Sequence, residues 1–345
     1  MNDAHRFRSL LRSRLFRIVA LSALAEGAIA CGPIKGQRDE CFDPNGTDGG
    51  VMATGGGGGA SGAGGMGGEA GSANAITCPA PEEAMNRFEL GDYCKVLSID
   101  GPPSVKNGEC CYPVTEQCPS AGRPFVVEGR AITAAGGASD GWRMPLTPRI
   151  ETLSPDARTA LAERWLRDAL AEHASIASFA RASLELMALG APASLVEATH
   201  RAALDETRHA QLCFALASAY AGRELGPGAF DFGGTVTIAT DLATLAARAV
   251  IEGCVGETLA AIEAAEKLAL ETDPTVQRVL AEIAEDEARH AELAWSTVAW
   301  ALRTGGTEVR AAVQAAFDDA TSRTIAPGLD DVVRPAMRLL LRDEW

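Results

Sequence analysis

The sequence predicts an all-α protein in which a four-helix bundle with a long crossover follows a small disulfide-rich module and a Gly-rich linker. Three observations support this prediction. Long runs rich in Ala, Leu and Arg fill residues 151–306 and are separated by Gly and Pro. A hexapeptide at Asp205–Ala210 recurs, with one substitution, at Asp286–Ala291. Upstream of both copies, several cysteines lie close to a stretch that is mostly Gly.

Residues 1–30 have the layout of a secretory signal. Several arginines precede an apolar stretch from Ile18 to Ala30, which is too short to span a bilayer as a mature helix. Its end, Ala28-Ile29-Ala30-Cys31, resembles a bacterial lipoprotein signal, in which Cys31 would become the lipidated first residue. The same residues also fit ordinary signal cleavage. We therefore expect an exported protein of the periplasm or cell envelope, anchored to the membrane through lipidated Cys31.

Residues 31–75 are expected to form a flexible tether, because Gly, Ala and Ser dominate positions 55–73 and cannot bury enough apolar surface to fold. The tether leads to a small, loop-rich Cys module at 76–125. In an exported chain such a density of cysteines indicates disulfides, and six cysteines leave their connectivity open. Zinc or an iron–sulfur centre is the alternative, which the spacing disfavours because it lacks paired C-x-x-C knuckles. The six are Cys41, Cys78, Cys94, Cys110, Cys111 and Cys118. Adjacent Cys110 and Cys111 cannot easily bond to each other, so we expect each to pair elsewhere.

Two helices are expected in the first half of the bundle, which spans 151–306 after a connector at 126–150. Ser154-Pro155 is a typical helix start, with an N-cap serine and proline at the first helical position, and Gly190-Ala191-Pro192 ends the run. The same proline opens a second helix that ends near Gly222. A link this short predicts an antiparallel hairpin.

The second half is expected to repeat this arrangement. Residues 223–235, rich in Gly, supply the long crossover. A third helix runs from about Asp241 to Glu271, and Asp273-Pro274 caps a fourth that ends at Gly305-Gly306. Residues 307–345 are expected to form accessory helices outside the bundle. Charged residues interrupt every helix, so none is predicted to cross a membrane.

The repeated hexapeptide is the strongest functional signal in the chain. Each copy contains Glu-x-x-His, as Glu206 with His209 and as Glu287 with His290. A Glu and a His three positions apart lie on one side of a helix, so both can reach one metal ion. Two such pairs therefore indicate two ions.

Each half of the bundle carries a further acidic residue one helix earlier. Glu172 and Glu252 occupy matching places in apolar helices. One Glu from each of two helices, with Glu-x-x-His from each of the other two, is the ligand set of di-iron and di-manganese carboxylate bundles. The candidate metal ligands are therefore Glu172, Glu206, His209, Glu252, Glu287 and His290.

Two other features of the third helix bear on the site. Glu257 lies on a different face from Glu252 in a regular helix, so it could join the site only through a local π-bulge. Gly253 and Gly256 allow either close helix packing or open space beside the metals. Cys213 and Cys254 also lie near the ligands, where buried free cysteines acting as small apolar groups are expected.

Residues 155–304, with both Glu-x-x-His pairs, resemble the ferritin-like superfamily of ferritins, rubrerythrins, manganese catalases and diiron oxygenases. The resemblance implies that Glu206 and Glu287 bridge two metals and that Glu172 and Glu252 are terminal ligands. His209 and His290 would each supply one nitrogen. It further implies a dinuclear iron centre, with manganese as the alternative, that reacts with O2 or H2O2. Ferroxidase, peroxidase, catalase-like and oxygenase chemistry all fit these six ligands.

The alternative function is a non-catalytic lipoprotein whose bundle binds metal or docks a partner. A metal-free bundle would require all six ligand positions to be coincidental. The net charge of −15 argues against nucleic acid or an anionic membrane face as a partner of the folded part. The sequence indicates no particular protein partner or organic substrate.

Overall fold

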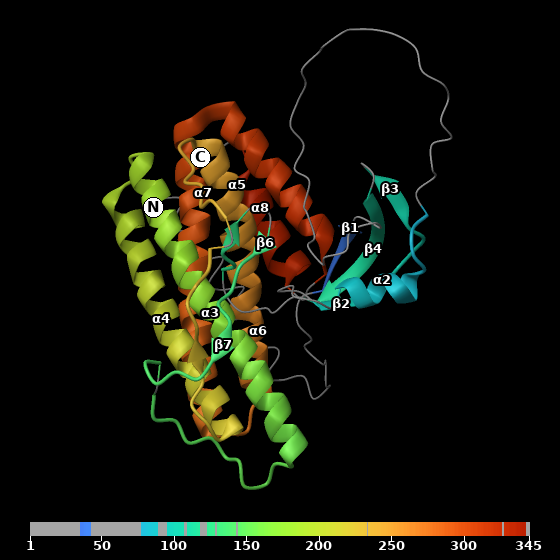
Figure 1. Cartoon of the computed structure of the whole chain (residues 1–345). Coiled ribbons are helices and arrows are strands. Elements are labelled where there is room, and N and C mark those ends of the chain that lie inside the picture. Colours follow the sequence, from blue (N-terminus) through green and yellow to red (C-terminus); the bar gives the residue numbers. More distant parts are fainter. Residues whose placement is uncertain are drawn as a thin grey trace. The chain divides into compact units, whose positions relative to one another are not determined.

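The computed structural model describes residues 35–42, 77–88, 95–106, 109–117, 123–127, 130–142, 144–232, 234–325 and 328–342. The described chain is mostly helical and divides into two compact units (Figure 1). One unit is Gly36–Gln117, and the other is Met1–Lys35 together with Cys118–Trp345. The predicted signal, Cys31 and the Gly-rich stretch lie outside the described residues. Within the described ranges, no helix is both long enough and apolar enough to cross a membrane.

The smaller unit is a β-sheet with one helix, whereas a loop-rich module was expected at 76–125. Strand β1 lies within 31–75, where a flexible tether was expected. Its elements are β1 (Lys35–Phe42), α2 (Pro81–Phe88), β2 (Lys95–Ile99), β3 (Ser104–Lys106) and β4 (Glu109–Gln117). Strand β4 pairs antiparallel with both β2 and β3. Tyr112 and Val114 alternate along β4 and pack against Ala84 of α2, which gives this unit a small core of its own.

Disulfides hold this unit together, as predicted. Cys78 bonds to Cys110, and Cys111 is also disulfide-bonded. The adjacent cysteines of β4 therefore do not bond to each other. The pairing of the remaining predicted disulfide cysteines lies outside the described residues.

The first helical hairpin of the larger unit has the predicted boundaries. Helix α3 (Pro155–Ala188) begins after Ser154, whose Oγ accepts a hydrogen bond from the Ala157 N–H at 3.2 Å. Helix α4 (Ala193–Ala221) ends at Gly222, which adopts a left-handed conformation with φ 67°. The two helices lie side by side along their length (Figure 1).

The second half of the larger unit departs from the predicted regular helix. Asp241 caps α5 (Leu242–Arg248), which continues as a π-helical segment η1 (Ala249–Val255) and then as α6 (Gly256–Leu270). One continuous α-helix was predicted for this stretch, from about Asp241 to Glu271. A Cβ at Gly253 would overlap the Ala294 side chain, so this glycine serves close helix packing and not open space.

Helix α7 (Pro274–Arg323) completes the helical core and is kinked at Gly306, whose φ is 69°. The kink lies at the predicted end of the fourth helix. The segments beyond it are the second part of α7, β9 (Thr324–Ile325), η2 (Leu329–Val333) and α8 (Arg334–Leu340). The second part of α7, η2 and α8 share a hydrophobic core with the preceding helices, and the Phe317 ring stacks on Trp295 at 5.4 Å.

Residues 123–150 belong to the larger unit, although the sequence analysis divided them between the Cys module and a connector. They include β5 (Val126–Val127), β6 (Arg130–Ala131) and β7 (Gly136–Gly137), and β7 pairs with β8 (Gly226–Pro227) of the crossover. The Arg123 N–H donates to Ser175 Oγ of α3 at 2.9 Å, and the Arg149 N–H donates to Asp273 Oδ2 at 2.5 Å. Hydrogen bonds from backbone N–H groups to side-chain oxygens therefore attach this segment to the helical part of the unit.

Candidate metal centre

Five of the six predicted ligands converge in the interior of the larger unit. Glu172 lies on α3, Glu206 and His209 on α4, and Glu287 and His290 on α7. Each of these residues is almost fully buried, with at most 3% of the residue's surface exposed. Buried charged residues are costly unless they are paired or bind a metal, so this concentration requires a physical explanation.

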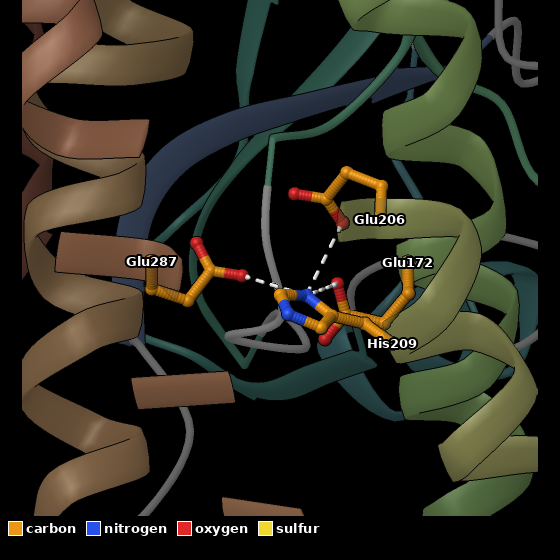
Figure 2. Close-up of side chains that lie close together, drawn as sticks. All are labelled: Glu172, Glu206, His209 and Glu287. Atoms are coloured by element: carbon orange, nitrogen blue, oxygen red, sulfur yellow. Dashed lines mark ion pairs between the residues drawn. The ribbon is translucent and has the colours of Figure 1, made fainter. Parts of the chain in front are cut away.

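The first cluster surrounds His209. One ligand atom from each of Glu172, Glu206, His209 and Glu287 lies within 4.8 Å of the others. His209 Nδ1 lies 3.8 Å from Glu172 Oε2, 3.8 Å from Glu206 Oε2 and 3.5 Å from Glu287 Oε1. Figure 2 shows the three carboxylates pointing toward the imidazole, with Glu287 reaching it from the side opposite Glu172 and Glu206.

The second cluster surrounds His290 and contains Glu206, Glu257 and Glu287 under the same 4.8 Å limit. His290 Nδ1 lies 3.0 Å from Glu206 Oε1 and 3.6 Å from Glu287 Oε2. Glu257 on α6 is fully buried and supplies the remaining carboxylate. The second cluster thus mirrors the first in composition, with three carboxylates and one imidazole.

Glu206 and Glu287 belong to both clusters. Glu206 directs Oε2 toward His209 and Oε1 toward His290. Glu287 directs Oε1 toward His209 and Oε2 toward His290. Each shared carboxylate therefore presents one oxygen to each cluster, which is the arrangement needed to bridge two cations.

The ligand atoms of this site lack hydrogen-bond partners. Among the described residues, the buried side-chain atoms without a partner include both carboxylate oxygens of Glu206, Glu257 and Glu287, Glu172 Oε2, and Nδ1 of His209 and His290. Leaving one buried polar group unpaired costs about 1–3 kcal/mol, and more if it is charged. Carboxylate oxygens with imidazole nitrogens form a suitable donor set for divalent metals. The residues present therefore fit metal ions, whose identity the donors alone do not fix.

Two aspartates of the repeated hexapeptide hold the outer nitrogens of the histidines. His209 Nε2 lies 3.0 Å from Asp286 Oδ2, and His290 Nε2 lies 3.3 Å from Asp205 Oδ2. Such outer carboxylates fix the ring orientation, which leaves Nδ1 free for a metal. The sequence analysis assigned them no role, although each copy of the hexapeptide begins with this aspartate.

The ionisation of the cluster reflects burial and crowding. Burial lowers the pKa of His209, but the hydrogen bond with Asp286 and the close carboxylates of the cluster outweigh this effect and raise that pKa well above its usual value. The pKa of His290 is raised in the same way. Burial, with repulsion from neighbouring carboxylates, raises the pKa of Glu172 and Glu257 well above the usual value. Several ligands of the metal-free site therefore hold protons that a metal would displace.

Glu252, predicted to be the sixth ligand, lies in neither cluster. Its Oε1 lies 2.6 Å from Arg181 Nη2 and its Oε2 lies 3.3 Å from Arg123 Nε, while Ser178 Oγ donates to Oε2 at 3.1 Å. Glu257 takes its place in the second cluster. The prediction for Glu252 was wrong because it assumed a regular helix. The π-bulge on which a role for Glu257 was made conditional is present as the π-helical segment Ala249–Val255.

The two free cysteines of the described residues belong to neither cluster. Cys213 and Cys254 are free and buried, as expected.

No family model matches this chain, and neither a curated protein nor a solved structure matches it. The function is therefore inferred from the site itself.

Proposed function

We propose that this protein is an exported member of the ferritin-like superfamily whose dinuclear iron centre reacts with O2 or H2O2. The observation that carries this proposal is the sharing of Glu206 and Glu287 between two clusters. Each shared carboxylate offers one oxygen to each side. Two independent mononuclear sites would not need common ligands.

The helical arrangement supports the family assignment. Helices α3 and α4 form one hairpin, and the α5–η1–α6 segment packs on α7 to form another. A long segment between Gly222 and Asp241 connects the hairpins. A four-helix bundle with one such crossover is the architecture of ferritin-like proteins.

In this proposal Glu206 and Glu287 would hold both ions, and Glu172 and Glu257 would each hold one of them. His209 and His290 would each supply one nitrogen through Nδ1. This set, rich in oxygen and free of thiolate, suits iron or manganese. When bound, such a pair of ions supplies two-electron redox chemistry toward O2 or H2O2.

The protein's own residues orient the ligands and exclude water. Asp286 and Asp205 fix the histidine rings from outside. The Phe179 ring lies 5.2 Å from the His290 ring, and it is 1% exposed. An apolar wall of this kind limits solvent access and influences the redox potential of a bound metal.

Metal analysis of the full chain tests this proposal. Protein purified without chelators and reloaded anaerobically with ferrous iron is expected to hold about two ions per chain. A Glu206→Gln, Glu287→Gln double variant is expected to lose both. Glu285→Gln is the control, because this glutamate lies on the same helix and its side chain is 81% exposed. Zinc or copper acquired during purification is removed first, since both bind such sites tightly.

The ferrous protein is then exposed to O2 and to H2O2 while its absorption spectrum is recorded. Rapid oxidation in the wild type, absent from the double variant, supports an oxidoreductase. Bound metal that reacts with neither oxidant would favour the non-catalytic metal-binding alternative. Folded protein that cannot be loaded with iron or manganese would refute the dinuclear site.

Export to an oxidising compartment belongs to the same proposal. The Cys78–Cys110 disulfide supports it, because structural disulfides are rare in reducing compartments. We expect the full-length protein to fractionate with membranes, and Cys31→Ser to release it in soluble form. A full-length protein that stays in the reducing cytosol would contradict this part of the proposal.

A further inference from the structure

A small pocket lies beside the first cluster, among α3, α4, α6 and α7. On α3 and α7 its lining residues are spaced three and then four positions apart, so each helix presents one face to it. The lining residues of these two helices are Trp165, Asp168 and Glu172, with Leu280, Ile283 and Glu287. Both rows end at a candidate metal ligand. The pocket therefore leads along the helices to the first cluster.

The charged residues Lys267, Asp168 and Glu263 are the lining residues of the pocket that reach solvent. The Lys267 side chain is 22% exposed, and Asp168 and Glu263 are 13% and 12% exposed. Glu172 and Glu287, at the cluster, are only 4% and 1% exposed. Exposure thus falls from a charged mouth to the buried ligands.

Three charged side chains lie close together at the mouth of the pocket. Lys267 Nζ lies 2.7 Å from Glu263 Oε1 and 3.8 Å from Asp168 Oδ2. Four carboxylates and one ammonium line the whole pocket, so its electrostatic potential disfavours anions.

The volume of the pocket limits what can pass. It measures about 30 Å³. A cavity needs about 10–15 Å³ by this measure to hold one water molecule, so the pocket accommodates about two. O2, H2O2 and water fit this space, whereas an organic substrate does not.

We propose that this pocket is the entrance from solvent to the metal cluster, and that the substrate is a neutral molecule of the size of O2 or H2O2. The substrate part of this inference rests on the proposed function. It selects among the reactions that the six ligands allow, because it excludes oxygenation of an organic molecule at this entrance. Lys267, held by Glu263, narrows the mouth.

Two cysteines allow the entrance to be tested without metal. Cys213 lines the pocket, whereas Cys254 lies in a close-packed hydrophobic core. Both are free, they are 1% and 0% exposed, and burial raises the pKa of both thiols well above the usual value. Cys254 is therefore a matched internal control for Cys213.

The experiment treats the full-length, metal-free protein with methylmercury, a small thiol reagent, or with fluorescein maleimide, a bulky one. Mass spectrometry of the two cysteine peptides follows each reaction. Methylmercury is expected to modify Cys213 at least about tenfold faster than Cys254, because Cys254 reacts only after local opening. Maleimide should modify both slowly. Equal rates of methylmercury modification at Cys213 and Cys254, or fast maleimide labelling of Cys213, would contradict the proposal that the pocket is the entrance.

Two variants sharpen this test. Ala264→Leu fills the pocket and should slow the reaction of Cys213, whereas Lys267→Ala opens the mouth and should accelerate it. The Cys254 rate in the same molecules reports any general loosening of the fold. If the modification rate of Cys213 changes in parallel with that of Cys254 in both variants, the reagent does not reach Cys213 through the pocket.

The size limit has a separate readout in the iron-loaded protein. Oxidation of the ferrous form by H2O2 should exceed oxidation by cumene hydroperoxide at least about tenfold, and comparable rates would overturn the limit. Selective labelling of Cys213 in a protein that binds no metal would refute the proposed function and leave the entrance standing. Two bound ions with equal thiol rates would refute the entrance alone.

Discussion

His209 on α4 is hydrogen-bonded through Nε2 to Asp286 on α7, at 3.0 Å. The reciprocal pair joins His290 on α7 to Asp205 on α4, at 3.3 Å. Each of these two helices therefore orients the candidate metal-binding histidine of the other. The two hairpins must pack correctly before either imidazole can face the cluster, so folding and formation of the site are coupled.

Removal of one outer carboxylate should weaken metal binding without removing a ligand. Asp286→Asn keeps the shape of the side chain but replaces the ionised carboxylate, which accepts a hydrogen bond from His209 Nε2, with a neutral amide. The orientation of the His209 ring is then no longer fixed. We expect the affinity for Co2+, measured by competition with a chelating dye, to fall about 10–100-fold. Asp205→Asn should have a similar effect through His290. Glu285→Gln serves as the control on α7, and an unchanged affinity in both aspartate variants would disprove the orienting role.

Metal binding should release protons and strengthen as the pH rises. The pKa values of His209 and His290 are raised, mainly because nearby carboxylates outweigh the opposing effect of burial. Burial also raises the pKa of Glu172 and Glu257. A metal requires deprotonated ligands, so it displaces these protons. Titration with Co2+ in weakly buffered solution, with a pH indicator, should detect them. Binding without proton release would contradict the raised pKa values.

The same shifts predict how the stability of the metal-free protein depends on pH. A group whose pKa is higher in the folded state stabilises the fold below its unfolded pKa, and this contribution is lost as the pH rises through the folded value. The two histidines and Glu172 and Glu257 all act in this direction. The pKa values of Glu206 and Glu287 are lowered, so these two residues act in the opposite direction, but only below about pH 4.5. We expect the urea midpoint of metal-free protein to fall as the pH rises above about 6.5, the usual pKa of histidine. Bound metal should remove most of this dependence.

Glu257 and Glu252 should respond differently to the same substitution. Glu257→Gln removes a ligand of the second cluster, so we expect the metal content to fall from about two ions to about one. Glu252→Gln should leave the metal content unchanged, because this residue lies outside both clusters. It should nevertheless destabilise the fold by about 3–5 kcal/mol, since Arg181 and Arg123 would lose a buried partner. Elemental analysis and urea unfolding of both variants separate these outcomes, and loss of metal in Glu252→Gln would reverse the assignment.

Local signals made much of the helical unit predictable. Ser154 and Asp241 accept hydrogen bonds at the starts of their helices, and Gly222 and Gly306 mark positions where the backbone leaves the helix. Glu-x-x-His pairs are equally local, because their two members lie on one helical turn. These features depend on neighbours in the sequence, which a single chain displays directly.

Features that depend on distant contacts could not be read in this way. A regular 3.6-residue period placed Glu252 at the site. The sequence analysis named Glu257 as a ligand only if a π-bulge forms, and the formation of the π-helical segment Ala249–Val255 has no local pattern that would predict it. Arg123 lies far from α3 and η1 in the sequence, yet it contacts Ser178 and Glu252. A buried salt bridge of this kind has no local pattern. The sheet around β4 was missed because its density of cysteines suggested loops.

The disulfide unit and the metal unit should respond separately to reduction. The Cys78–Cys110 disulfide closes a loop with a sequence separation of 32. Removing a disulfide that closes a loop of this size lowers the free energy of unfolding by about 3–4 kcal/mol. Because Gly36–Gln117 is a compact unit with a core of its own, this loss should fall on that unit. A Cys78→Ser, Cys110→Ser double variant should therefore become sensitive to protease within residues 36–117 while retaining its bound metal. Limited proteolysis with metal analysis tests this. Loss of metal in the variant would show that the disulfide unit supports the site, because none of the six proposed ligands lies in residues 36–117.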